Sequence, residues 1–448
     1  MAALAPTTGC AEALLLIEVD SGKVLQADNA TMPWYPASTT KLMTTYVTLK
    51  AVKERRLSLD TLVTVSANAV AQQPSKMGFR AGTQLTVDNA LKMLMVKSAN
   101  DMAVVLAEGV SGSIEKFADE MNLASQRLGM TQSSWVNPNG LPADEQITSA
   151  RDMAILARAL IRELPEYDFY WHIPSIKFGK RVMRNYNTLI DRYPGADGMK
   201  TGFICASGFN LVASATRNNK RLIAVVFGAP SSPVRAAKAA AMLEHGFSGN
   251  GLNWLMPSLG SVENLAPINA MPPNLREEMC GKHRRRPAAE EADEDEQANG
   301  DTGSQQSFML SNLKGSAPKP SSLIGPLVES QPPIPVFIGP PRAPKGTAVA
   351  TAPTTTPAVN AARAAAKKPA AASLAVPATT APAKPAAAAA KPTTAAKPSP
   401  ATAKSGDAAK TSATAKTTAV TDPAKPAATP QPKPKTAKIK PPAAPAAQ

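Results

Sequence analysis

The chain has 448 residues, a formal net charge of +15 and 42 prolines. About 16 Lys and Arg but only two acids lie in residues 342–448, so nearly all of the net charge belongs to this tail and the rest of the chain is close to neutral. The sequence contains no run of 18 or more apolar residues, which excludes a transmembrane helix, and its three histidines lack the spacing of metal ligands.

Hydrophobic patterning predicts strands at both ends of the first 250 or so residues and helices between them. In chain order, we expect a hairpin over 13–30, a helix over 39–54, two helical runs between 86 and 110, helices over 111–130 and 148–164, a hairpin over 208–229 and a closing helix over 232–247. Strands from both ends of the segment then form one largely antiparallel sheet, with helices inserted between them and packed on both faces. The predicted class is an α/β sandwich; a doubly wound fold would need strands and helices that alternate.

Composition divides the chain further, because its character changes after Leu265. We expect an N-terminal remnant over 1–12, a globular domain over 13–250, a domain-closing extension over 251–280, a charged, proline-rich linker over 281–341 and a basic Ala/Pro/Thr/Lys-rich tail over 342–448. The tail cannot build a packed core and is expected to be disordered. The first residues show no signal peptide, and we expect it to lie upstream or to have been removed.

The stretch YPASTTKLM places Ser38 and Lys41 three residues apart, where an extended segment turns into a helix. Positions i and i+3 share a helix face, so Lys41 Nζ can approach Ser38 Oγ. A serine hydroxyl needs a base to act as a nucleophile, and lysine serves as one when burial or a neighbouring cation lowers its pKa. The free N–H groups of a helix N-terminus also suit a developing oxyanion. The pair predicts a nucleophile and its base, or else a helix cap followed by a surface lysine.

Two further motifs favour the first interpretation. KSAND places Ser98 and Asn100 at the break between two helical runs, and Lys200, Thr201 and Gly202 form K-T-G just before the second hairpin. S-x-x-K, S-x-N and K-T-G in this order are the signature of penicillin-recognising acyl-serine enzymes. With DSGKVLQADNA, SANDMAVVLAE, VNPNGL and SGFNLVASATRNNKRLIAVVFGA, residues 13–249 resemble the low-molecular-mass penicillin-binding proteins that are serine-type D-alanyl-D-alanine carboxypeptidases. The resemblance implies a β-lactamase/transpeptidase-like sandwich.

It also implies an activity: hydrolysis of the terminal D-alanine from peptidoglycan stem pentapeptides, without metal or cofactor, in an exported, periplasmic protein that β-lactams acylate. Ser38 would attack the carbonyl of the penultimate D-Ala, and Lys41 would take its proton. Ser98 would relay a proton to the leaving D-Ala. The backbone N–H groups of Ser38 and Phe203 would form the oxyanion hole.

The remaining implied roles concern substrate binding. Asn100 would bind the substrate amide, and Lys200 would hold Ser98 and add positive potential. Thr201 would grip the peptide, and Gly202 would lack a side chain so that an extended peptide can approach the strand edge. Arg235 falls where these enzymes keep a cation near the substrate carboxylate; its alternative is an exposed helix arginine.

Several alternatives stay open at this stage. Endopeptidase action on cross-links would use the same residues, and a non-catalytic penicillin-binding sensor or wall-binding module would keep the cleft. A class A-like β-lactamase would need a glutamate in an E-x-x-x-N setting, which Glu145, Glu163 and Glu166 lack. Cys205 is either a buried small residue or half of a disulfide with Cys280.

The basic tail has two alternatives of its own. It either contacts cell wall or an anionic membrane through unspecific charge attraction, or is a solvated linker without a partner. Nucleic acid does not fit the compartment, and the tail has no aromatic residues for base stacking.

Overall fold

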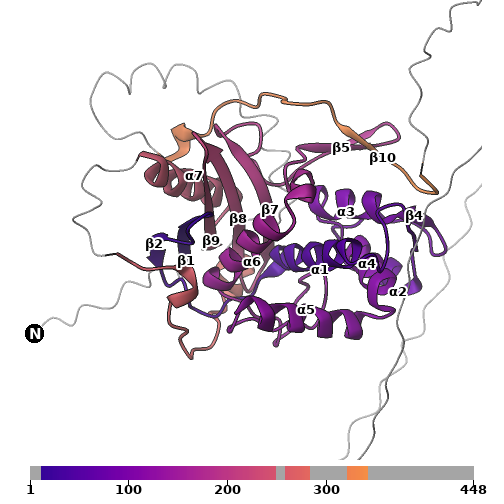
Figure 1. The fold of residues 1–448 in the computed structure, drawn as a ribbon, viewed down its shortest axis with the longest axis horizontal. Coiled ribbons are helices and arrows are strands. Elements are labelled where there is room, and N and C mark those ends of the chain that lie inside the picture. The colour runs from indigo at the N-terminus through magenta and orange to yellow at the C-terminus, as the bar shows by residue number, and fades with distance from the viewer. Residues whose placement is uncertain (1–11, 249–257, 283–319, 342–448) are drawn as a thin grey trace, which may run out of the picture. The chain divides into compact units, whose positions relative to one another are not determined.

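The computed structural model describes residues 12–248, 258–282 and 320–341 (Figure 1), all within a unit that spans Met1–Pro353. A second unit, Thr354–Gln448, lies outside the described residues, and so do the whole tail and all but residue 12 of the expected remnant over 1–12. No helix among the described residues is both long and apolar enough to span a bilayer.

The main sheet joins the two ends of the globular segment, as predicted. Its five antiparallel strands lie in the order β2-β1-β9-β8-β7. Their bounds are β1 Ala13–Glu18, β2 Val24–Asp28, β7 Ala196–Ile204, β8 Gly208–Arg217 and β9 Lys220–Ala229. Leu15 of β1 pairs with Val225 of β9, so the first strand of the chain lies beside the last strand of this sheet. The edge strand β7 carries the K-T-G motif.

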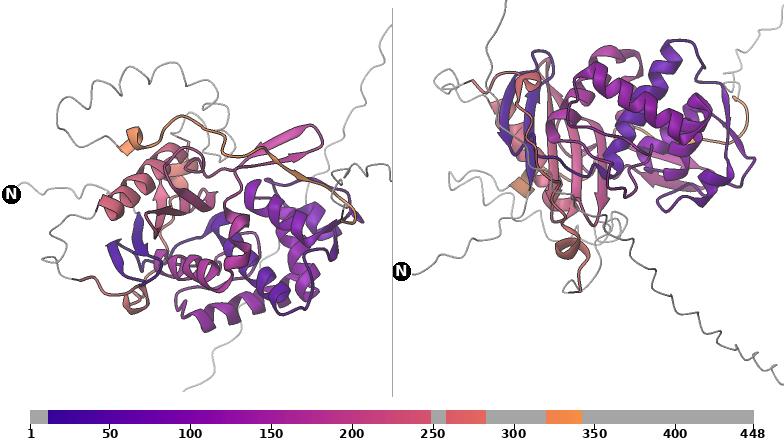
Figure 2. Two further views of the ribbon diagram at one scale, coloured as in Figure 1. Left: turned by 45° about the horizontal axis from the view of Figure 1, so that its top comes forward. Right: turned by 90° about the horizontal axis from the view of Figure 1, so that it is seen from below.

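Helices cover both faces of this sheet. Their bounds are α1 Lys41–Lys53, α2 Ala67–Ala71, α3 Val87–Val96, α4 Asn100–Ser111, α5 Ile114–Leu128, α6 Ala150–Glu163, α7 Ser232–Ser248 and α8 Arg276–Cys280, with 3₁₀ turns η1 Ala37–Thr40, η2 Pro165–Trp171, η3 Val262–Asn264 and η4 Pro320–Leu323. Side chains alternate across β9: Val225 enters the core shared with α1, α3, α4 and α6, and Val226 enters the core under α7. Figures 1 and 2 show α6 and α7 on opposite faces. The predicted α/β sandwich is confirmed.

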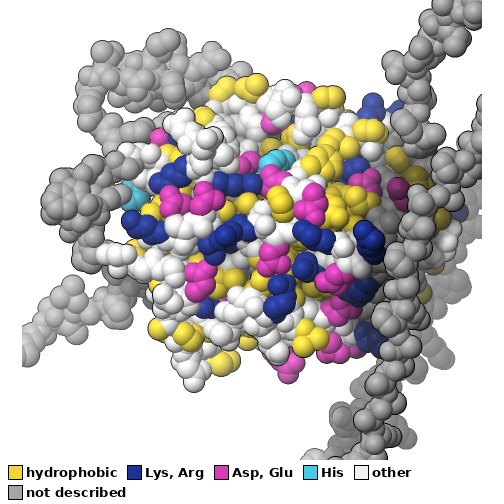
Figure 3. Space-filling view, viewed as in Figure 1, with side chains coloured by type: hydrophobic (Ala, Val, Ile, Leu, Met, Phe, Trp, Pro, Cys, Tyr) yellow, Lys and Arg dark blue, Asp and Glu magenta, His cyan; other side chains and the backbone are white. Residues whose placement is uncertain are grey.

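Local sequence explains where the helices start and stop. The side chains of Ser66, Thr86, Ser113 and Ser149 each accept the backbone N–H three residues on, which caps α2, α3, α5 and α6. The α5 helix ends at Gly129 in the left-handed region, where glycine is favoured. On the face seen in Figure 3, acidic and basic side chains lie interspersed, in keeping with a folded part that is close to neutral.

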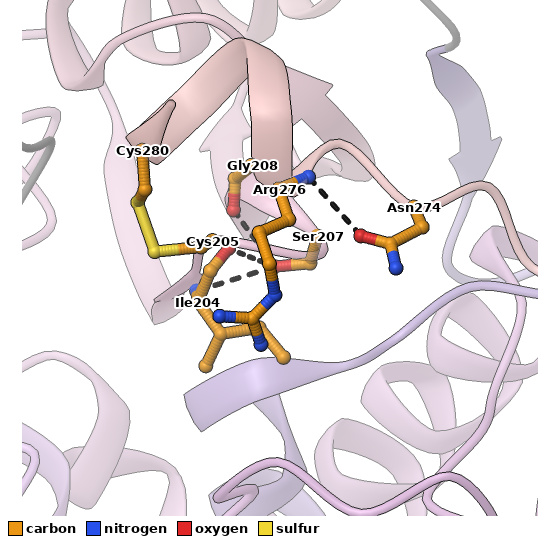
Figure 4. Close-up of a disulfide and its surroundings, with 7 residues drawn as sticks. All are labelled: Ile204, Cys205, Ser207, Gly208, Asn274, Arg276 and Cys280. Carbon is orange, nitrogen blue, oxygen red and sulfur yellow. Dashed lines mark hydrogen bonds between the residues drawn. A yellow bond between two sulfur atoms is a disulfide. The ribbon is translucent and has the colours of Figure 1, made fainter. Parts of the chain in front are cut away.

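Packed residues lie on both sides of Leu265, where the composition changes. Val262, Leu275 and Met279 are buried in the core. Cys280, at the end of α8, forms a disulfide with Cys205, just past the end of β7 (Figure 4). The Leu275 N–H also donates to the Ala206 carbonyl at 3.0 Å. The segment 258–282 therefore ties the turn between β7 and β8 to the rest of the domain, and of the two alternatives for Cys205 the disulfide is the one observed.

Two small sheets flank the helices. One has the order β10-β5-β6, with β5 Ser175–Phe178, β6 Arg181–Arg184 and β10 Ile334–Val336; the other pairs β3 Leu62–Thr64 with β4 Gln84–Thr86. We call residues 320–341 the strap. It runs from η4 beside α7 to β10 beside β5, as the orange segment of Figure 1 shows. This proline-rich segment was expected to be a linker, yet it adds a parallel strand to the hairpin β5–β6.

Candidate active site

Ser38 and Lys41 meet at the junction of η1 and α1. Lys41 Nζ lies 2.8 Å from Ser38 Oγ, and the lysine side chain is fully buried. The predicted helix start is displaced, because Ser38 lies in a 3₁₀ turn and α1 begins at Lys41. Side chains three residues apart eclipse each other in a 3₁₀ turn, so the turn brings the pair together directly. The alternative of a surface lysine is excluded by its burial.

Two further groups hold the Lys41 amine. Asn100 Oδ1 and the Asn139 carbonyl each lie 2.7 Å from Nζ. A neutral lysine has two N–H groups and one lone pair. The protonated amine donates to all three oxygens, whereas a neutral amine that kept its N–H groups on Asn100 and Asn139 would turn its lone pair toward Ser38 Oγ. The arrangement therefore suits a base that receives the serine proton.

Asn100 belongs to a wider network that sequence reasoning missed. Its Nδ2 donates to the Gln73 carbonyl at 2.9 Å, and its backbone N–H donates to the Ser75 carbonyl at 2.7 Å. The neighbouring Asp101 accepts from the backbone N–H groups of Met77 and Gly78. Burial raises the Asp101 pKa, although these N–H donors favour the charged form. The loop over 72–78 thus braces Asn100, whose side chain serves Lys41 before any substrate arrives.

The turn Asn139–Gly140, within the VNPNGL stretch, supplies the second acceptor for Lys41. A Cβ at Gly140 would lie 1.8 Å from the Ala37 carbonyl oxygen, and its φ of +80° favours glycine. Thr44 of α1 also donates to the Pro138 carbonyl, at 2.5 Å. Only the fold reveals that this turn packs against the residue before Ser38, because 98 positions separate Lys41 from Asn139.

The K-T-G strand lies against the nucleophile. A Cβ at Gly202 would lie 2.7 Å from the Ser38 backbone nitrogen and 2.9 Å from that of Thr39. Glycine is therefore required at position 202 so that β7 can pack on η1. The sequence suggested a different reason, namely that the missing side chain lets an extended peptide approach the strand edge. The same contact places the backbone that leads into Phe203 next to the Ser38 N–H. Asn210, opposite Gly202 on β8, donates to the Tyr35 and Pro36 carbonyls and so fixes the approach to Ser38.

Ser98 stands at the start of the second motif with φ of +57°. Its buried Oγ has no hydrogen-bond partner among the described residues, so the expected contact with Lys200 is not made in this structure. Lys200 is buried, and its Nζ donates to the Thr201 carbonyl at 3.1 Å. The Thr201 hydroxyl is likewise buried without a hydrogen-bond partner in the described part of the chain. Ser98 and Thr201 thus each offer an uncommitted hydroxyl.

Arg235 is 2% exposed, which excludes the alternative of a surface helix arginine. It donates to the carbonyls of Asn210 and Tyr186 and lies over the Phe209 ring. On the other side, the amine of Lys97 donates to the Tyr186 hydroxyl. Sequence reasoning missed Lys97 and Tyr186. They place two more cationic or polar groups between the S-x-N motif and α7.

Two of the glutamates weighed for a β-lactamase lie elsewhere. Glu163 accepts from the Tyr46 hydroxyl, and Glu166 pairs with Lys53 at 3.0 Å, both near the end of α1 opposite to Lys41. Among the described residues, no three His, Cys, Asp or Glu side chains gather as metal ligands.

Comparisons with known proteins point to one family. A family model described as D-alanyl-D-alanine carboxypeptidase matches residues 2–231. D-alanyl-D-alanine carboxypeptidase DacA of Haemophilus influenzae is 38% identical over 243 residues, which cover 53% of this chain and 62% of that protein. The crystal structure of penicillin binding protein 5 from Haemophilus influenzae is similar at 36% identity and a TM-score of 0.51, covering 55% of this chain and 73% of that chain. Penicillin binding protein 6B from Escherichia coli follows at 33% identity and a TM-score of 0.51, covering 55% and 79%. The chain thus spans less than two thirds of the curated relative it matches.

Proposed function

The chain belongs to the D-alanyl-D-alanine carboxypeptidase family, and we propose that it removes the terminal D-alanine from peptidoglycan stem peptides ending in D-Ala-D-Ala. The observation that carries this proposal is the buried Lys41 amine, 2.8 Å from Ser38 Oγ and held by Asn100 and the Asn139 carbonyl. Asn100 and the Asn139 carbonyl already stabilise the buried Lys41 amine, so its contact with Ser38 is not needed for packing. That contact has the geometry of a general base beside a nucleophile.

In the acylation step, Ser38 Oγ attacks the carbonyl carbon of the penultimate D-Ala while its proton passes to Lys41 Nζ. The carbonyl oxygen becomes an oxyanion that accepts from the backbone N–H groups of Ser38 and Phe203. The close approach of Gly202 to the Ser38 nitrogen supports this pair of donors. Because both donors belong to packed backbone, the site needs little rearrangement as charge develops.

The intermediate collapses when the C–N bond breaks. The leaving D-Ala nitrogen takes a proton from the Ser98 hydroxyl, which Lys41 replenishes, and an ester remains on Ser38. The buried, unpartnered Ser98 Oγ supports this relay. Water then attacks the ester carbon, with Lys41 again as the base, and releases the shortened peptide. The same Ser38 attack on a β-lactam carbonyl would leave a covalent adduct.

Cations at the end of β7 suit a substrate that ends in a carboxylate. Lys200 is buried within K-T-G, and Arg235 is buried against Asn210 and Phe209, which pair with Gly202 and Phe203. We propose that Lys200 and Arg235 supply positive potential for that carboxylate and that Thr201 donates to it. Asn100 adds a contact to the substrate amide through the second N–H of its Nδ2.

We also propose that the protein works outside the cytoplasm. A disulfide between cysteines 75 residues apart persists in oxidising compartments and is rare in cytosolic proteins. The proposed substrate, the stem peptide of peptidoglycan, also lies outside the cytoplasm. The tail over 342–448 would then add unspecific attraction to anionic wall or membrane.

The experiment is direct. Purified protein is incubated with a soluble pentapeptide that ends in D-Ala-D-Ala, and free D-Ala is measured; the same peptide ending in L-Ala is the specificity control. We expect release from the first peptide alone, and none by the Ser38→Ala variant. A folded protein that is acylated by penicillin but releases no D-Ala would instead be a binding module. Release from cross-linked dimers at a higher rate than from the pentapeptide would favour the endopeptidase alternative.

A further inference from the structure

A group of exposed cations beside the site has no part in the mechanism above. We define the basic rim as Arg80, Lys177, Lys180 and Arg181, all exposed. None of the four forms an ion pair with another described residue, whereas the nearby Arg184 pairs with Glu329. Residues 169–190 contain no acid at all. This hairpin is therefore a local concentration of positive charge.

The rim is joined to the active site on two sides. Phe178, in the hairpin β5–β6, packs on Phe79 with ring centroids 5.2 Å apart, and Phe79 follows the loop that braces Asn100. Beyond β6, the chain continues within two residues to Tyr186, whose hydroxyl accepts from the Lys97 amine next to Ser98. The hairpin therefore stands on the side of the site formed by the loop over 72–80 and the S-x-N motif.

The hairpin is also held in place. Val336 of the strap pairs with Phe178, and the Phe337 N–H donates to Asn89 Oδ1 at 3.0 Å. Figures 1 and 2 show β10 running beside β5. Lys177 and Arg181 lie on this braced strand pair, and Lys180 lies in the turn between the strands, so their backbone positions are fixed before a ligand binds.

We propose that the basic rim binds the carboxylate-bearing peptidoglycan polymer to which the substrate peptide is attached. This inference rests on the proposed function, because an enzyme that trims a side peptide must hold its end while the parent polymer lies alongside. Repeated carboxylates match a cluster of exposed cations near the hairpin turn, which raises the local concentration of the polymer. A lipid surface fits less well, since Val182, 45% exposed, is the one large apolar residue exposed on the hairpin. Single-stranded nucleic acids bind surfaces with exposed aromatic rings on which bases stack, whereas the Phe178 ring of the hairpin packs against Phe79.

The test compares two full-length variants with the same charge change. The rim variant carries Lys177→Glu, Lys180→Glu and Arg181→Glu. The control carries Lys23→Glu, Lys116→Glu and Lys282→Glu, exposed lysines on other elements that form no ion pair with a described residue. Release of D-Ala is measured from the soluble pentapeptide and from purified, pentapeptide-rich sacculi. Sedimentation with sacculi, and separately with anionic phospholipid vesicles, is measured in a Ser38→Ala background.

At low ionic strength, we expect the rim variant to lose about ten-fold in release from sacculi while the soluble peptide is turned over within about two-fold of wild type. The control variant should lose less activity than the rim variant on sacculi and should also stay close to wild type on the soluble peptide. High salt should lower the wild-type rate on sacculi toward that of the rim variant. Equal rates on sacculi for rim variant and control, an equal loss on both substrates, or a loss of sedimentation confined to vesicles would each overturn the proposal. If the wild type releases no D-Ala from either substrate, the proposed function fails, and the Ser38→Ala sedimentation still decides on the rim.

Discussion

The contact between Gly202 and the nucleophile allows a prediction from geometry alone. A Cβ at Gly202 would lie 2.7 Å from the nitrogen of Ser38, 2.9 Å from that of Thr39 and 3.1 Å from the Pro36 oxygen. All three are backbone atoms, so no side chain can rotate away. Ordinary van der Waals contact begins near 3.4 Å. Gly202→Ala must therefore push β7 and η1 apart by several tenths of an ångström.

Two consequences of Gly202→Ala follow. Overpacking of this kind costs about 1–3 kcal/mol of unfolding free energy. A displacement approaching 1 Å between nucleophile and oxyanion donors costs up to about 10²-fold in rate. We expect acylation by a fluorescent penicillin to slow by about 10- to 100-fold while the protein stays folded. The assay is the second-order acylation rate, with urea unfolding measured in parallel.

Gly246→Ala is the matched control for Gly202→Ala. Its Cβ would lie 2.6 Å from Leu222 Cδ1 and 2.9 Å from Leu16 Cδ2, in the core under α7 and away from Ser38. Because these atoms are the ends of leucine side chains, which can shift, Gly246→Ala should cost less stability than Gly202→Ala and should leave acylation unchanged. Gly325→Ala, where the nearest atom is 3.4 Å away, should change neither. A folded Gly202→Ala protein that acylates at the wild-type rate would refute the reasoning.

Three further predictions concern the base, a charged contact and the tail. Lys41→Arg keeps the charge but cannot lose a proton at working pH, so acylation should fall by about 10³-fold or more with folding intact; a rate near wild type would remove Lys41 from the mechanism. Burial opposes ionisation of Asp168, but the hydrogen bond from His172 and the charge of Arg221 outweigh it and lower its pKa. The contribution of the ionised Asp168 carboxylate to the free energy of unfolding is therefore complete above its ordinary pKa of 3.8. This contribution is lost as the pH falls through the lowered pKa of the folded protein. Asp168→Asn should cost about 1–2 kcal/mol in urea unfolding near pH 7, and this difference should shrink in acid; a constant difference would contradict the assignment. Removal of residues 342–448 should leave pentapeptide hydrolysis unchanged and weaken sedimentation with sacculi, most at low salt, whereas loss of turnover would mean that the tail supports the site.

The sequence was enough to predict the fold class and to single out Ser38 as the candidate nucleophile. Strand and helix patterns are local, and so are S-x-x-K, S-x-N and K-T-G. Their order allowed Ser38, Lys41 and Ser98 to be assigned before any contact was known.

What the sequence could not provide depends on tertiary contacts. The Asn139 carbonyl is a backbone group, so the residue type at this position does not indicate that it accepts from Lys41. Asn210 and Gly140 act by packing against residues near Ser38 from more than a hundred positions away. The burial of Arg235 follows from the way α7 lies on β8. The strap was missed because a proline-rich segment carries no alternating pattern, and its strand forms only on the edge that β5 offers.

The central claim is that Ser38 is the nucleophile and Lys41 its base. It is tested most directly by trapping the wild-type protein with penicillin and locating the added mass. Trypsin cleavage after Lys23 and Lys41 isolates residues 24–41, which contain Ser38. We predict one penicillin adduct per protein on Ser38, and none in the folded Ser38→Ala and Lys41→Arg variants over the same time. An adduct on another residue, or full labelling of the Ser38→Ala variant, would contradict the account.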